Sequence, residues 1–383
     1  MITLTNAENA LKNVYLGTVT NLLNTKVNPL LAKIEQTQTD VYGNEIRTAA
    51  KIGLNGGISA GDEDGYLPAA GGNNYIQFVS TLKNLYGQIA ISDKAIRASR
   101  DGRGAFTDLL NAELEGLLEA AKFNLGRMLY GDGSGFLSTF MPQTPDGLYY
   151  VTDVRNLMEG MLVDVYTSAG RDVAATRITY VDRVNSLIRF SVNPTAESGS
   201  LYVQGSKDKE LTGLKSIFNV SSPLYGVDRQ LNPALSPYVK SDAGAISETM
   251  IQQAIDSVET NANSKIDFIG VSADVKYAFQ EYMAQYKRNI EMMDIEGGYK
   301  SMSFNGIPLV YDRFIENGTM YLLDTSAIKL HQLCDWRFLE TENGNILRQA
   351  QDKPVYTATL VKYCDLICAK PNGQAKISGI TNA

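Results

Sequence analysis

The sequence is poor in the residues that build metal centres and disulfide frameworks. It has one histidine, His331, and three cysteines, Cys334, Cys364 and Cys368, among 383 residues. A single histidine excludes a metal site made of several imidazoles, and it leaves one candidate for imidazole acid–base catalysis. An odd and sparse set of cysteines does not predict a disulfide framework. We therefore expect a fold without disulfide bonds, in a reducing compartment.

Long apolar runs and an excess of basic charge are also absent. No run of about 18 apolar residues occurs, so we expect no membrane-spanning helix. The first residues lack the basic and apolar regions of a signal peptide, which predicts synthesis in the cytoplasm. The net charge of −7 disfavours sequence-specific recognition of nucleic acid. The hydrophobic share of 44% is that of a folded protein, and the length predicts two or three compact units.

Residues 1–40 predict an N-terminal arm. Apolar residues recur there at mixed three- and four-residue spacings, and Pro29 suits the first turn of a second short helix. Such an arm has too little apolar surface to fold alone, so we expect it to dock on another surface.

Residues 37–74 predict a long loop without a core of its own. Glycines gather between Gly53 and Gly72, around the acidic run Asp62-Glu63-Asp64. A long glycine-bearing loop inside a folded chain is usually functional or disordered. Alternating apolar residues then predict strands at 75–79 and 87–91. The segment from 41 to 92 is therefore predicted to be an extended β-loop that needs a partner surface.

Residues 106–130 give the strongest helix prediction. Leucines and other apolar residues recur at spacings of three and four along one face, acidic residues crowd the first half, and basic residues occupy the second. Thr107 is a plausible N-cap, and Gly131 is a plausible left-handed residue after the helix. We expect one long spine helix on which other elements lie.

The rest of the chain predicts a mixed body of α+β class. Short alternating strands and turn signals in 148–205 are typical of a small sheet or barrel inserted into a larger domain. Helices are expected to begin at Ser247 and at Ser272, with a buried strand at 267–271 between them. Further strands are expected at 307–311, 320–323, 356–363 and 366–369.

Histidine and cysteine chemistry is disfavoured by spacing. His331 and Cys334 are three residues apart, so on a strand their side chains would face opposite ways. The simpler interpretation is an ordinary histidine at a sheet edge. Cys364 and Cys368 would lie about 13 Å apart on an extended strand, too far to share one zinc ion. We expect both to be small buried hydrophobic residues.

The glycine-rich and acidic segments also lack the sequence patterns of catalytic or ligand-binding sites. Gly131-Asp132-Gly133-Ser134-Gly135 follows a helix, whereas a phosphate-binding loop follows a strand and precedes a helix. Ser134 also lacks the surroundings of a nucleophilic serine. Asp62-Glu63-Asp64 lacks the alternating ligand spacing of a calcium loop, so we expect solvated charges. Elements that cannot bury their own surface remain, which favours a subunit of an assembly.

Several segments resemble one family of proteins. They are 65–68 (Gly-Tyr-Leu-Pro), 82–93, the helix end at 129–135, 304–310 and 321–326. In the content and order of these segments, the chain resembles the major capsid proteins of tailed bacteriophages with the HK97-like fold. The resemblance covers most of the chain, and the helix followed by Gly-Asp-Gly-Ser-Gly is its most telling part.

The resemblance implies an order of domains along the chain. They are the N-terminal arm (1–40), the extended loop (41–92), the spine helix with part of the peripheral domain (93–147), an inserted β-rich domain (148–210), a return to the peripheral domain (211–245), the axial domain (246–345) and C-terminal strands of both domains (346–383).

It also implies a function without catalysis or a cofactor. Subunits would assemble with one another into hexamers and pentamers of an icosahedral shell around double-stranded DNA, which they would not read in sequence. The implied location is the virion, after assembly in the host bacterial cytoplasm, without a membrane. Portal, scaffolding and decoration proteins are the further partners implied. The candidate inter-subunit residues are Gly61, Asp62, Glu63, Asp64, Gly65, Tyr66, Leu67 and Pro68.

Three alternatives remain open on the sequence. An encapsulin-like compartment shares the fold but holds protein cargo. A tail protein or adhesin would be richer in β-structure than the long helices at 106–130 and 247–287 allow. An enzyme could use carboxylates that only folding brings together.

Overall fold

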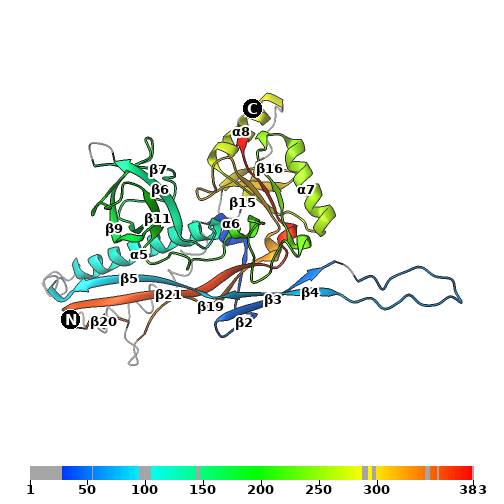
Figure 1. Cartoon of the computed structure of the whole chain (residues 1–383), viewed down its shortest axis with the longest axis horizontal. Helices are drawn as coiled ribbons and strands as arrows, with labels where there is room; N and C mark the ends of the chain where they lie inside the picture. The colour runs from blue at the N-terminus through cyan, green and yellow to red at the C-terminus, as the bar shows by residue number, and fades with distance from the viewer. Residues whose placement is uncertain are drawn as a thin grey trace. The chain divides into compact units, whose positions relative to one another are not determined.

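The computed structural model describes residues 28–53, 55–94, 105–143, 147–286, 292–295, 299–340, 346–351 and 353–381. They form two compact units (Figure 1). The first contains Lys83–Lys215 and Asp335–Lys362, and the second contains Pro29–Leu82, Ser216–Cys334 and the chain from Tyr363. Strands β19 (Ile328–Phe338) and β21 (Val355–Cys368) contribute residues to both units.

The spine helix of the first unit is α5 (Ala105–Tyr130). It confirms the strongest helix prediction, but Thr107 lies inside the helix, so the predicted N-cap is wrong. Leu114 and Leu118 are buried on one face, and the last turns are buried on every side. Strand β5 (Lys83–Ser92) packs against α5, where Gly87 leaves room for Leu117: a Cβ at Gly87 would lie 2.9 Å from Leu117 Cδ1.

The helix ends without a left-handed Gly131. Gly131 N–H donates to the Met128 carbonyl (3.0 Å), which tightens the last turn, and positive φ angles occur instead at Gly133 (+83°) and Gly135 (+74°). The predicted position of the left-handed residue is therefore wrong, although the predicted helix-terminating turn is present. Next to this turn, Arg127 and Glu210 form a bidentate ion pair whose side chains are 4% and 3% exposed.

The β-rich block is a closed barrel with its own core. Its strands follow the order β10-β7-β6-β11-β8-β9. Their bounds are β6 (Phe136–Gln143), β7 (Tyr149–Val151), β8 (Leu162–Thr167), β9 (Gly170–Asp182), β10 (Leu187–Phe190) and β11 (Gly199–Val203). The barrel begins at Phe136, before the expected boundary at 148, because β6 closes it. Its first and last strands pair at Phe136↔Tyr202, so the chain enters and leaves at adjacent points, as an insertion requires.

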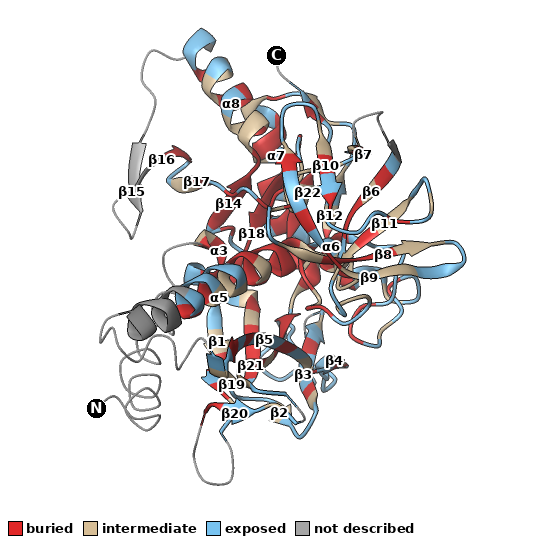
Figure 2. Ribbon diagram, turned by 90° about the vertical axis from the view of Figure 1, so that its left-hand side faces the viewer, coloured by how far each residue is buried: buried red, intermediate tan, exposed pale blue. Residues whose placement is uncertain are grey.

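The second unit is built on a seven-stranded sheet in the order β12-β22-β18-β14-β17-β16-β15. The strands are β12 (Tyr238–Lys240), β14 (Phe268–Val271), β15 (Met292–Ile295), β16 (Tyr299–Phe304), β17 (Ile307–Tyr311), β18 (Met320–Leu323) and β22 (Ala375–Ile377). Helices α7 (Glu248–Ala262) and α8 (Ala273–Tyr286) cover it, with buried faces that pack on β14 and β18 (Figure 2). Ser247 is the N-cap of α7 and accepts from Met250 N–H (3.3 Å), as predicted.

Shorter elements complete the described chain. They are α3 (Pro29–Lys33), β1 (Glu35–Thr37), β2 (Val41–Tyr42), β3 (Glu45–Ile52), β4 (Asn74–Thr81), α6 (Leu214–Phe218), β13 (Gly244–Ala245), β20 (Arg348–Gln349) and β23 (Ile380–Thr381), with 3₁₀ turns at Pro233–Leu235, Thr325–Ala327 and Pro371–Gly373. Pro29 starts α3, as predicted, and the helical pattern before it lies outside the described residues. No helix of the described chain has the length and apolarity needed to cross a bilayer.

Two strand predictions need correction. Strand β3 was missed although Glu45, Arg47 and Lys51 alternate with inward residues, because the inward Thr48 and Ala50 are too polar or too small to mark a buried face. The two strands expected at 356–363 and 366–369 are one strand, β21, whose Asp365 is buried rather than in a turn.

Candidate assembly surface

The eight candidate inter-subunit residues lie on one loop between strands β3 and β4. The two strands pair in antiparallel register from Glu45↔Thr81 to Ile52↔Asn74, and the loop continues beyond their ends (Figure 1). Every residue from Gly61 to Pro68 is exposed. The structure therefore brings all eight candidates together on a surface that the rest of the described unit does not cover.

The base of this hairpin is held by buried polar contacts. Ser80 Oγ donates to Asp365 Oδ2 over 2.6 Å, and Val79 N–H donates to the Tyr225 carbonyl over 3.0 Å. The rings of Phe78 and Tyr225 lie 5.4 Å apart. These contacts come from β21 and from the turn around Tyr225, so the end of β4 that is farther from the loop is fixed to the second unit.

Tyr225 itself is part of a fully buried network. Its hydroxyl donates to the Leu366 carbonyl (2.9 Å) and accepts from Cys368 N–H (3.1 Å). Burial, followed by the negative charges that Cys368 and Asp365 can carry, raises the pKa of Tyr225 well above its usual value. Burial also raises the pKa of the Cys368 thiol to about 12. Both groups are therefore neutral hydrogen-bonding or packing residues at physiological pH.

Burial falls along the hairpin toward the loop. Ile46, Ala50 and Phe78 share one face and are at most 1% exposed. Farther along the same face, Ile52 and Ile76 are only half-buried although they are apolar. The apolar face thus continues past the point at which the described unit can cover it.

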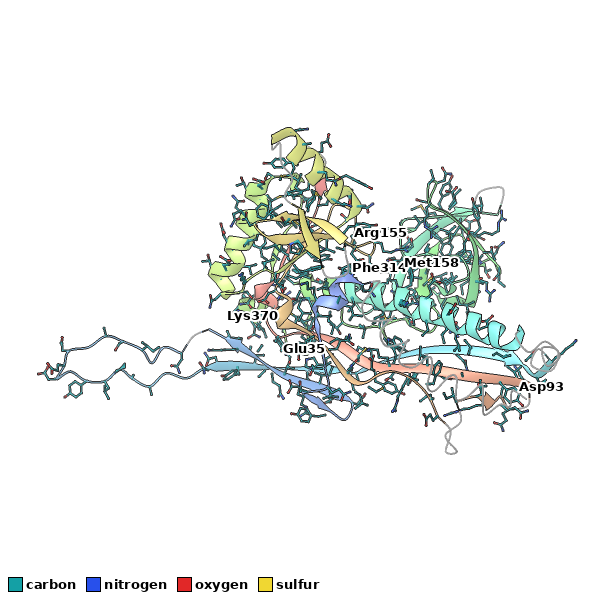
Figure 3. The ribbon with its side chains drawn as sticks, turned by 180° about the vertical axis from the view of Figure 1, so that it is seen from behind. Glu35, Asp93, Arg155, Met158, Phe314 and Lys370 are labelled. Atoms are coloured by element: carbon teal, nitrogen blue, oxygen red, sulfur yellow. The ribbon has the colours of Figure 1, made fainter. Side chains whose placement is uncertain are left out.

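The outer part of the loop exposes large apolar side chains. A turn closes where Gly65 N–H donates to the Asp62 carbonyl (3.1 Å), and Tyr66 and Leu67 follow it with exposures of 104% and 92%. Ile58, on the other arm of the loop, is 88% exposed. Figure 3 shows the side chains of this loop pointing away from its backbone with no described element beside them. The acidic residues 62–64 are fully solvated, as expected.

The two arms of the loop approach closely near its base. Asn55 Oδ1 accepts from Gly57 N–H (2.9 Å), and both groups lie against Gly71 on the opposite arm. A Cβ at Gly57 would lie 2.6 Å from Gly71 N, and a Cβ at Gly71 would overlap Asn55 Oδ1. We call Asn55, Gly56, Gly57 and Gly71 the loop constriction. Sequence reasoning missed it, although the Asn-Gly-Gly run was a signal for a tight backbone approach.

Two kinds of sequence candidate, the histidine and a pair of cysteines, are buried in the described chain. His331 is 3% exposed and its Nδ1–H donates to the Thr39 carbonyl (2.9 Å). It lies on β19 between β1 and β21, so it is a buried interior histidine and the expected sheet-edge position is wrong. Cys364 and Cys368 are fully buried, as predicted. Within the described ranges, no three acidic, histidine or cysteine side chains gather where they could hold a metal ion.

Comparison with known proteins places the chain among shell proteins. Residues 157–358, just over half of the chain, match the model of the SU10 major capsid protein family. No curated protein matches the sequence significantly.

Among the solved structures that match the chain, two illustrate the shared fold. A chain of the capsid asymmetric unit of cyanophage A-1(L) has a TM-score of 0.57 and 11% identity, over 94% of this chain and 93% of that one. A chain of the holo-SrpI encapsulin complex from Synechococcus elongatus PCC 7942 has a TM-score of 0.51 and 11% identity, over 93% and 89%. At such identities the likeness concerns the fold alone.

Proposed function

Because this chain belongs to the SU10 major capsid protein family, it is a phage capsid protein and not an enzyme, and we propose how its subunits join. Copies of the chain assemble into a shell, and the loop between β3 and β4 lies on a neighbouring copy. Hexamers and pentamers of one sequence close this shell around double-stranded DNA. The single observation that carries the proposal is an apolar loop end, Tyr66-Leu67, on a hairpin whose base is rigidly held.

The energetics favour such a contact. Burying a leucine or a large aromatic side chain yields about 1.5–3 kcal/mol, and Tyr66 and Leu67 gain none of it in the isolated chain. The buried base of the hairpin fixes where the loop starts, and the apolar area covered at the loop end must outweigh the entropy lost when its exposed residues become ordered. Because symmetry repeats the contact at every subunit, a modest gain at one contact stabilises the whole shell.

The predicted domains fit this scheme. Residues 41–92 form the inter-subunit loop, 93–147 with 211–245 belong to a peripheral domain, and 246–345 form an axial domain. The barrel within 148–210 is an inserted domain. The α5 spine and the closed barrel of the first unit, and the seven-stranded sheet of the second, support this division in part. Residues 216–245 belong instead to the second unit, where β12 is a strand of the seven-stranded sheet.

The remaining partners are those that the resemblance to tailed-phage capsid proteins implies. An acidic chain, with a net charge of −7, repels packed DNA and would contact it without reading its sequence. A portal, and in some assemblies scaffolding or decoration proteins, would complete the particle in the host cytoplasm.

Electron microscopy of the chain expressed alone tests the shell, and loop variants test the contact. Leu67→Ser should lower the yield of particles or capsomer rings at least about tenfold, since each subunit loses buried apolar area. The matched control is Leu231→Ser, a leucine that is 79% exposed on another segment of the second unit. Equal particle yields from both variants would remove the loop from the assembly contact but leave the shell function intact.

The contents of the particles distinguish a virus from a compartment. The likeness to an encapsulin chain, with a TM-score of 0.51, makes an enclosed enzyme the second candidate. Particles that co-purify with one host enzyme would favour it, whereas particles formed with phage proteins would support the capsid.

A further inference from the structure

The loop constriction contains an asparagine followed by glycine, the pair that is most open to attack by its own backbone. Five such pairs occur, at Asn55, Asn305, Asn317, Asn343 and Asn372. Four of them lie within the described residues, and Asn343 does not. We propose that Asn55 is a self-modification site, at which the free subunit converts the side-chain amide to aspartate or isoaspartate.

The reaction needs only the chain and water. A solvent base removes the proton of Gly56 N–H, and this nitrogen attacks Asn55 Cγ. The bond from Cγ to the side-chain nitrogen then breaks, and ammonia leaves with a proton from solvent. Water opens the resulting five-membered imide at Cγ to give aspartate, or at the backbone carbonyl to give isoaspartate. The balance is one water consumed and one ammonia released, without an oxidant or a cofactor.

The geometry at Asn55 favours the first step. Negative charge develops on Oδ1 as the nitrogen attacks, and Oδ1 already accepts the Gly57 N–H over 2.9 Å. A hydrogen-bond donor placed at the oxygen that becomes charged lowers the barrier, as in an oxyanion hole. Gly56 is exposed, and apart from its chain neighbours no atom lies within 4 Å of the position that a Cβ would occupy there. Gly56 N itself lies toward Gly71, where a Cβ would stand 2.9 Å from it, and the absence of a side chain at Gly71 leaves this nitrogen room to approach Cγ.

At two of the other described Asn-Gly pairs, the backbone nitrogen that would attack is already hydrogen-bonded. Gly318 N–H, next to Asn317, donates to Asp274 Oδ2 (2.5 Å), and Gly373 N–H, next to Asn372, donates to the Lys370 carbonyl (3.0 Å). Their nucleophiles are thus engaged.

Asn305 is restrained in a different way. It lies with Gly306 in the tight turn between β16 and β17, where both residues have positive φ, and its Nδ2 donates to Gln252 Oε1 (2.7 Å). This side chain would have to leave both the turn and the hydrogen bond before Cγ could be attacked.

The modification would change the shape of the loop. Isoaspartate places one additional carbon in the backbone between residues 55 and 56, at the point where the arms meet Gly71. Either product also adds a negative charge to a loop that already carries Asp62-Glu63-Asp64. Aged free subunits would then differ from fresh ones at the surface that the loop presents.

The test follows the wild-type chain during incubation at mildly alkaline pH. Peptide mapping by mass spectrometry locates each converted amide, and an isoaspartate methyltransferase counts the isoaspartate. We expect Asn55 to convert at least about ten times faster than Asn305, Asn317 or Asn372, a barrier difference of about 1.4 kcal/mol. Comparable conversion at any of these three, or an intact Asn55, would overturn the proposal.

A variant isolates the role of the backbone. Gly56→Ala fits the open space at this position, so the loop is kept, but its methyl group hinders the approach of the nitrogen to Cγ. In this variant the conversion of Asn55 should slow severalfold. Trypsin releases Asn55 and Asn73 in one peptide, so the conversion rate of Asn73 serves as the internal reference for that of Asn55. An unchanged rate at Asn55 in this variant would show that backbone attack is not the route.

Discussion

The barrel at 136–203, which lies between helices α5 and α6 along the chain, and the loop between strands β3 and β4 differ in what they bury. The barrel closes on itself, so it has no free strand edge and it encloses a core that includes Phe140, Val163 and Leu201. The loop has neither a core nor a covering element in the described chain, and Tyr66 and Leu67 remain in solvent. A segment that buries its own apolar surface contributes to the stability of the subunit, whereas one that cannot is available for another copy.

A substitution in the core of the barrel should cause the largest loss of stability. Phe140 is 1% exposed, and its ring contacts those of Tyr149 and Phe190 edge-on. Phe140→Ala should lower the free energy of unfolding by about 3–5 kcal/mol, through lost burial and the cavity left behind. Denaturant unfolding measures the loss, and Tyr180→Ala, on the outer barrel face at 42% exposure, is the control. Similar losses in both variants would contradict a self-contained barrel core.

A substitution at the base of the hairpin should lower the free energy of unfolding by an intermediate amount. Ser80→Ala removes the hydrogen bond to the buried Asp365 carboxylate, which should cost about 1.5–3 kcal/mol of unfolding free energy. Ser241→Ala, at an exposed serine in the same unit, should change it by less than about 0.5 kcal/mol. If the two substitutions proved equal, the hairpin base would not be held as described.

Alkaline pH should destabilise the same part of the structure, where the β3–β4 hairpin is fixed to the second unit. The pKa values of Tyr225 and Cys368 are raised in the folded state above those in the unfolded chain, which are near 10 for tyrosine and 9.0 for cysteine. Below the unfolded pKa values, the two neutral groups make their full contribution to the free energy of unfolding. As pH rises through the range between the unfolded and folded pKa values, this free energy falls by up to about 1.4 kcal/mol per pH unit for each group. Unfolding curves at increasing pH measure this slope, which Cys368→Ala should flatten. A Tyr277→Phe control, at an exposed tyrosine, should keep the slope of the wild type.

The loop should give the smallest effect on stability and a large one on assembly. Gly71→Val overlaps Asn55 Oδ1 across the loop constriction, whereas Gly72→Val, at a neighbouring glycine outside the eight candidate residues, enters open space. Both should alter the free energy of unfolding by less than about 0.5 kcal/mol, because the loop buries little. Particle yield, counted by electron microscopy, should fall for Gly71→Val alone. A wild-type yield from Gly71→Val would show that the arms need not meet.

Strong local periodicity made several elements predictable. The spacing of apolar residues along α5 and α7 and the N-cap at Ser247 are short-range signals, and both helices appear as expected. The position of the long exposed loop was also readable, because glycine and acidic residues cannot form a core. Strand β3 was missed despite its alternation of outward charges with inward residues, because Thr48 and Ala50 on the inward face are weak signals of burial.

The sequence by itself determined the class of this protein, a mixed α+β chain with one long spine helix and a long exposed loop. Composition and spacing act locally, so they could be read without coordinates. Only the tertiary structure decided that β6 closes the barrel, that Ser80 meets Asp365 and that Asn55 lies against Gly71. These contacts join residues that are distant along the chain, and no local pattern encodes such pairings because they depend on how whole elements pack.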